Sequence, residues 1–153
     1  YSALYRPRSS RGLSIMQPAE DVIGAVGFSV MTVRPGDTAL AMGLSELPIV
    51  ATSHLLHSME SATIAAISEY LDNGETTFLL GTSIELLGSA PVGVELRANA
   101  RCTNIDGREL TFQCEIYDGE RLIAQGEIKR ATVERVTFLA RTAAQELLKS
   151  SNL

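Results

Sequence analysis

The segment from Val50 to Leu71 contains neither Gly nor Pro, and its apolar residues recur at spacings of three and four. This spacing is typical of a helix, and it gathers one apolar side made of Leu55, Met59, Ala62 and Ala66. Thr52 or Ser53 is placed to cap the start of this helix. Small or apolar residues occupy much of the remaining circumference, so several sides must be covered. The pattern predicts a long central helix over residues 50–71 with a sheet wrapped around it.

Most of the remaining chain alternates between apolar and polar residues with a period of two, which is typical of half-buried β-strands. A first strand over residues 28–33 stops at a turn over residues 34–37. A hairpin is predicted around a turn at residues 104–107. Its inward positions are Leu96, Ala98, Ala100, Cys102, Leu110, Phe112, Cys114 and Ile116. With a four-residue loop, Cys102 faces Glu109 and Cys114 faces Arg97, so we expect no disulfide.

Two further strands are predicted on either side of this hairpin. The earlier one has a shared face made of Phe78, Leu80, Thr82, Ile84 and Leu86. The later one directs Leu122, Ala124, Gly126 and Ile128 to the core, and the same parity carries Arg130 onto this apolar face. Residues 134–148 then have apolar positions at helical spacing, which predicts an amphipathic helix that closes the domain.

Composition fits one globular domain, because the chain has 153 residues, of which 45% are hydrophobic and 20% are charged. We expect an N-terminal arm over residues 1–15, rich in Arg and without acids, followed by a single domain over residues 16–153. The net charge of −5 makes nucleic acid an unfavourable partner. No apolar run has the length of a membrane span or the form of a signal peptide. We therefore expect a cytoplasmic protein that does not bind membranes.

Metal chemistry is not indicated. The two cysteines, Cys102 and Cys114, and the two histidines have neither the number nor the spacing of a zinc site. We expect both cysteines to be reduced, buried thiols.

The predicted order of a strand, a long buried helix and four antiparallel strands is that of the hotdog fold, an α+β architecture. The sequences ATSHLLHSMESATIAAISEYL, LLGTSIELLGSAPVG and GEIKRATV resemble the fluoroacetyl-CoA thioesterase-like branch of the hotdog thioesterases. The resemblance covers about residues 28–138. It implies an acyl-CoA substrate, no metal or redox cofactor, and a homodimer that joins sheets edge to edge and builds two sites at the interface.

The resemblance also implies roles for individual residues. Thr52 and Glu60 match a Thr at the start of the family's helix and a catalytic Glu eight residues later. Gly81 and Thr82 match the Gly-Thr that opens the next strand, where the Gly helps to bind the thioester carbonyl, and Arg130 matches an Arg late in the last strand. One element differs, because Gly88 stands where the family has a catalytic His.

The residues themselves suggest how such a site would work. Thr52, with Ser53 beside it, lies where free N–H groups at the helix start polarise a thioester oxygen or bind substrate. Glu60, on an otherwise apolar helix, fits a general base on water or a nucleophile. Arg130 either pairs with Glu60 or another acid, or holds a phosphate or carboxylate of the substrate. His57, and less readily His54, would replace the missing His as acid or base.

These observations favour hydrolysis of a small acyl-CoA thioester to a free acid and CoA. The alternative is a hotdog protein that binds acyl-CoA or another small ligand and has lost catalysis with the His. A hotdog lyase acting on enoyl-CoA would need an Asp and His pair at the helix start, and that Asp is absent.

Overall fold

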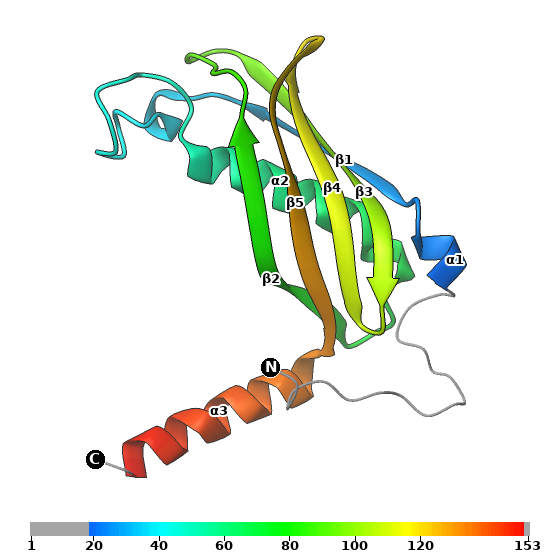
Figure 1. The fold of residues 1–153 in the computed structure, drawn as a ribbon. Helices are drawn as coiled ribbons and strands as arrows, with labels where there is room; N and C mark the ends of the chain where they lie inside the picture. Colours follow the sequence, from blue (N-terminus) through cyan, green and yellow to red (C-terminus); the bar gives the residue numbers. More distant parts are fainter. Residues whose placement is uncertain (1–18, 152–153) are drawn as a thin grey trace.

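The sheet of the protein curls around a single long helix (Figure 1). The computed structural model describes residues 19–151, so the expected arm over residues 1–15 lies outside the described residues. Five antiparallel strands take the order β1-β3-β4-β5-β2, which leaves β1 and β2 at the edges. The strands are β1 (Val26–Thr32), β2 (Glu75–Leu86), β3 (Glu95–Asp106), β4 (Glu109–Asp118) and β5 (Arg121–Glu134). The helices are α1 (Ala19–Val22), η2 (Pro35–Asp37), α2 (Thr52–Ile67), η3 (Ser68–Tyr70) and α3 (Arg135–Ser151). This arrangement confirms the predicted α+β hotdog fold.

Helix α2 is the centre of the core. Leu55, Met59, Ala62 and Ala66 are all buried, as their spacing predicted. Strand β1 approaches α2 so closely that a Cβ atom at Gly27 would collide with the backbone of Ala62 and Ala66. The glycine is therefore required by packing rather than by a turn.

The start of α2 differs from the prediction. The N-cap residue is Ala51, which makes no side-chain cap hydrogen bond, and Thr52 is already the first helical residue. Both Thr52 and Ser53 are exposed. A backbone hydrogen bond holds the start of the helix instead, because the N–H of Ala51 donates to the Asp37 carbonyl at 2.9 Å. Thr52 and Ser53 thus remain available for roles other than capping.

The hairpin between β3 and β4 is tighter than expected. Its loop has two residues, Gly107 and Arg108, and Gly107 has a φ of 63°. Glycine at the first position is typical of a two-residue hairpin loop. An irregularity between Cys102 and Asn104 then shifts the register, so Cys102 faces Phe112 and Cys114 faces Ala100. The predicted pairings with Glu109 and Arg97 were wrong, whereas both thiols are buried as expected.

Bulges also break the predicted alternation in β2 and β5. In β2, Leu79 pairs with Arg130 and Gly81 with Lys129, so Leu80 is the extra residue and the five predicted residues do not share one face. In β5, an irregularity opposite the Ile116–Tyr117 step inserts Ile123, which is fully buried, while Leu122 is only half-buried. From Ala124 onwards the predicted parity holds, and Arg130 is buried with it.

Helix α3 forms where the sequence predicted a helix, but it does not close the domain. It projects from the lower end of the sheet, beyond the β2 edge (Figure 1). None of its residues is buried, and Val136, Leu139 and Leu147 are 59–72% exposed. Its first turns contact the body through Phe138, whose ring lies 4.8 Å from that of Phe78 on β2. Within residues 19–151, no helix has the length and apolar character needed to cross a membrane.

Candidate active site

An ion pair between α2 and the sheet joins two of the predicted site residues. Glu60 extends from the middle of α2, and its Oε1 accepts a hydrogen bond of 3.0 Å from Nη1 of Arg130 on β5. The Arg130 side chain is only 6% exposed, whereas the Glu60 side chain is 31% exposed. The sequence left several partners open for Arg130, and the structure assigns Glu60. A buried guanidinium therefore fixes a carboxylate that still reaches the surface.

Thr77 on β2 completes the hydrogen bonding of Arg130, and sequence reasoning missed it. The Arg130 Nε donates to the Thr77 hydroxyl at 2.9 Å, and Nη2 donates to the Thr77 carbonyl at 3.3 Å. Regular alternation with Phe78 facing inward would have turned Thr77 outward. The bulge at Leu80 changes which residues face α2, and the neighbouring Gly81 was the available signal, since a Gly within a strand often marks a bulge.

Thr52 lies at the other end of the candidate site. It is the first residue of α2, where backbone N–H groups lack helical partners, and its side chain is exposed. Glu60 lies eight positions further along the helix, which corresponds to a rise of about 12 Å. One chain therefore presents two separated groups rather than one cluster.

The histidines lie along the same part of α2. His54 Nε2 is 3.7 Å from Oδ1 of Asp37, so this imidazole is associated with the turn that precedes the helix. His57 is exposed and lies one turn before Glu60. Of the two histidines, His57 is therefore the better placed to act with the carboxylate.

Gly81 and Thr82 lie on the outer strand of the sheet, beside the bulge. A Cβ at Gly81 would have no atom within 4 Å, so open space adjoins this backbone. The Thr82 hydroxyl donates to the Glu127 carbonyl at 3.1 Å, which ties β2 to β5. Gly81 thus offers an approach for a ligand, while Thr82 has a structural partner.

Gly88, where the resemblance led us to expect a His, lies two residues before a segment that contacts the residues preceding α2. The segment that follows it is bound to the residues before the helix, because the N–H of Val50 donates to the Ala90 carbonyl at 2.9 Å. A Cβ at Gly88 would meet Cγ2 of Ile123 at 3.3 Å and Nη1 of Arg121 at 3.5 Å. The space next to Gly88 is therefore narrow, and a guanidinium borders it.

Other features of the described residues lie apart from this ion pair. A groove of about 370 Å³ on the outer face of the sheet is lined by residues that include Phe28, Arg97 and Tyr117, and by none of the predicted site residues. No group of three His, Cys, Asp or Glu within residues 19–151 is arranged to hold a metal ion. Burial raises the pKa of both thiols, that of Cys114 to about 12. These cysteines are therefore poor nucleophiles at neutral pH.

The chain is similar to thioesterases in sequence. A relative from Streptantibioticus cattleyicolor, a fluoroacetyl-CoA thioesterase, is 31% identical over 100 residues, which cover 63% of this chain and 70% of the relative. Solved structures share the fold at lower identity. A mutant of a fluoroacetyl-CoA-specific thioesterase is 23% identical with a TM-score of 0.73, covering 80% of this chain and 96% of that one. A thioesterase superfamily member from Thermus thermophilus is 22% identical with a TM-score of 0.78, covering 84% and 96%.

A third structure, a hot-dog-like protein from Thermanaerovibrio acidaminovorans, has a TM-score of 0.75 at 16% identity, over 82% of this chain and 95% of that one. The family model described as fluoroacetyl-CoA-specific thioesterase matches residues 33–136, the part that runs from the end of β1 through Glu60, Gly81 and Arg130 to the first residues of α3. The chain therefore belongs to the fluoroacetyl-CoA-specific thioesterase family.

Proposed function

We propose that this protein hydrolyses a small acyl-CoA thioester to the free acid and CoA. The observation that carries the proposal is the Glu60–Arg130 pair, which holds a partly exposed carboxylate on an otherwise apolar helix. The pair with Arg130 offsets the cost of placing a carboxylate there, and the remaining exposure of Glu60 leaves it accessible to a substrate. Membership of a thioesterase family and the fluoroacetyl-CoA thioesterase named among the relatives support the same reaction class.

In the proposed reaction, the N–H groups at the start of α2 and the Thr52 hydroxyl stabilise the oxyanion that forms at the thioester carbonyl. Glu60 removes a proton from a water molecule as its oxygen bonds to the carbonyl carbon. The C–S bond then breaks, and the proton passes to the CoA sulfur. Direct attack by Glu60 would instead form an acyl-enzyme anhydride that water then cleaves.

This reaction needs Thr52 and Glu60 at one thioester, but a single α2 helix holds them about 12 Å apart. We propose that two copies of the chain join their sheets at the β2 edge, so that Thr52 of one copy works with Glu60 of the other. Strand β2 lies at the edge of the sheet, and Gly81, which has open space beside it, belongs to this strand. A two-fold axis would create two such sites per dimer.

The second candidate is a protein that binds acyl-CoA without turnover. The observation in its favour is Gly88, which supplies no proton where the family has a His. General acid–base help is typically worth about 10² to 10⁴ in rate, so hydrolysis without a replacement would be slow. Both candidates predict acyl-CoA binding, and only turnover separates them.

The test is release of free thiol from a series of acyl-CoAs, followed with a thiol reagent. The native protein adds little background, because the two cysteines are buried and their pKa values are raised. We expect turnover that is lost in Glu60→Gln. Saturable binding of acyl-CoA with no thiol release from any member of the series would support the binding protein instead.

His57 receives its own test, since it is the candidate replacement for the missing His. We expect His57→Ala to lose most turnover, because it removes the proposed acid or base. His54→Ala is the matched control, because His54 is associated with Asp37 instead. A His57→Ala protein as fast as the parent would exclude the replacement.

A further inference from the structure

Helix α3 carries an apolar stripe that the described residues of its own chain leave uncovered. Val136, Leu139 and Leu147, with Ala140 and Ala143 between them, lie on one side of the helix. Phe138, which packs on Phe78, is nine residues from Leu147 and so points to the opposite side. The contact that anchors α3 therefore turns the stripe away from the described part of the body. The family model ends at residue 136, so most of α3 lies beyond the matched region.

Charge indicates what kind of surface the stripe meets. Residues 135–151 hold three basic side chains and one acidic side chain, net +2. Residues 19–134 hold seven basic and 17 acidic side chains, net −10. A basic helix is repelled by a second α3 and attracted by an acidic body. The complementary surface is therefore the body of another copy rather than its α3.

The position of the first residue of α3 indicates where on a second copy the stripe would bind. Helix α3 starts beside the start of β2, because Glu134 pairs with Glu75 and the N–H of Arg135 donates to the Gly74 carbonyl at 2.8 Å. The segment that follows the opposite end of β2 lies beside the loop over residues 38–50, because Pro91 forms a bridge with Ile49 (Figure 1). Two β2 strands related by a two-fold axis run antiparallel. The start of β2 in one copy therefore lies near the loop end of β2 in the other.

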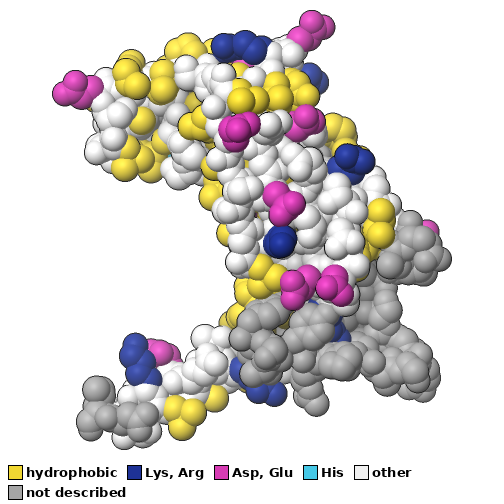
Figure 2. All heavy atoms as spheres, viewed as in Figure 1, with side chains coloured by type: hydrophobic (Ala, Val, Ile, Leu, Met, Phe, Trp, Pro, Cys, Tyr) yellow, Lys and Arg dark blue, Asp and Glu magenta, His cyan; other side chains and the backbone are white. Residues whose placement is uncertain are grey.

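That loop has its own uncovered apolar side chains. Leu40, Met42, Leu44 and Leu47 are 43–67% exposed. Figure 2 shows the molecule hollowed on this side, with apolar atoms above the hollow and α3 below it. With 17 residues, α3 extends about 25 Å from its first residue, a length close to the diameter of a small domain.

We propose that α3 packs its apolar stripe on the loop over residues 38–50 of a second copy, so that each chain of the dimer holds the other with this helix. The inference rests on the edge-to-edge dimer of the proposed function. It adds a contact outside the matched family region, next to the start of the partner's α2.

Association is measured by sedimentation equilibrium of the full chain. Leu147→Glu is expected to raise the dimer dissociation constant at least about tenfold, since it places a charge where the proposed contact would bury a Leu. Gln145→Glu is the matched control, because it adds the same charge on the opposite side of α3 and should leave the constant within about twofold. Equal constants for the two variants, or a monomeric parent, would overturn the inference.

A second experiment tests which surface of the other copy α3 contacts. Two variants that each carry one added cysteine, Leu44→Cys and Leu147→Cys, are mixed and oxidised. We expect covalent heterodimers. Leu147→Cys linking to itself in place of the heterodimer would show helix-to-helix pairing and overturn the assignment. Turnover is measured in a separate assay. A dimer that hydrolyses acyl-CoA but lacks the α3 contact would contradict only this inference. A dimer that has the α3 contact but shows no turnover would contradict only the proposed function.

Discussion

At the scale of single residues, the Glu60–Arg130 pair should affect both the stability of the fold and the proposed hydrolysis. Glu60→Ala removes the acceptor of a guanidinium that is only 6% exposed and leaves it the bonds to Thr77. We expect this change to lower the free energy of unfolding by about 1–3 kcal/mol, measured by urea titration. Glu60→Gln keeps an oxygen acceptor and should cost less, yet it should lose turnover by about 10² to 10⁴, as Glu60→Ala does. A Glu60→Gln protein with full turnover would remove Glu60 from the mechanism.

Gly88 gives a second prediction at this scale. Gly88→His introduces the side chain that the resemblance led us to expect at this position, and the nearest atoms to its Cβ would belong to the side chains of Ile123 and Arg121. We expect kcat to rise by at least about tenfold, because a positioned imidazole supplies acid–base help. Gly88→Ala tests the added Cβ alone and should remain at the parent rate. An increase shared by both variants would show that packing, and not the imidazole, was responsible.

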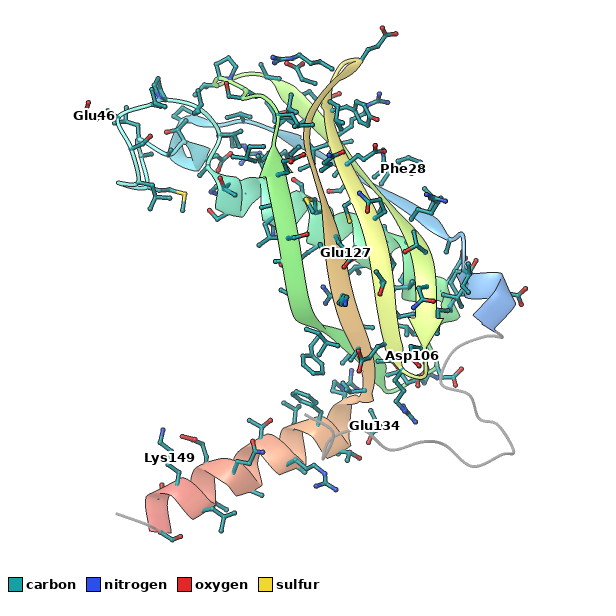
Figure 3. All side chains as sticks on the ribbon, viewed as in Figure 1. Phe28, Glu46, Asp106, Glu127, Glu134 and Lys149 are labelled. Atoms are coloured by element: carbon teal, nitrogen blue, oxygen red, sulfur yellow. The ribbon has the colours of Figure 1, made fainter. Side chains whose placement is uncertain are left out.

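At the scale of elements, Glu134 determines how α3 begins. Its carboxylate accepts hydrogen bonds from the Thr137 hydroxyl at 2.7 Å and from the N–H groups of Val136 and Thr137 at 2.8 and 3.0 Å. These bonds hold the pKa of Glu134 below its usual value, and the side chain lies at the junction of β5 and α3 (Figure 3). The lowered pKa means that the cap favours the helix above the usual pKa and is lost as pH falls through the lowered one.

We therefore expect the amides at the start of α3 to lose protection from hydrogen exchange on acidification. Glu134→Gln should weaken this protection at neutral pH and remove most of its acid dependence, because no carboxylate remains to titrate. NMR spectra of Val136 and Thr137 across the acid range give the readout. The same acid midpoint in parent and variant would show that another group governs the helix start.

Elements were predictable where a repeated pattern specified them, and local irregularities were not. Helix α2 and the inward residues of β3 and β4 followed from spacing alone. The hairpin register, Thr77 and Ile123 did not, because a bulge adds one residue and reverses the alternation beyond it. The Glu60–Arg130 contact joins residues 70 apart, and parity could bring Arg130 to the correct face without selecting its partner.

At the scale of the whole molecule, the groups of the proposed site lie apart within one chain. Thr52 and the segment around Gly88 lie at the start of α2, and Glu60, Arg130 and Thr77 lie in its middle. The exposed side of α3 and the acidic body also favour a second copy. Resemblance predicted a dimer, and the separation of Thr52 from Glu60 gives that prediction a physical reason.

The central claim, hydrolysis at a site shared by two chains, is tested most directly by complementation. Thr52→Val and Glu60→Gln proteins, each expected to be nearly inactive, are mixed, dissociated and reassociated, and acyl-CoA hydrolysis is measured. If each site combines Thr52 of one copy with Glu60 of the other, half of the dimers are mixed and hold one intact site, which restores about a quarter of parent turnover. No recovery in mixtures shown to contain heterodimers would contradict the shared site.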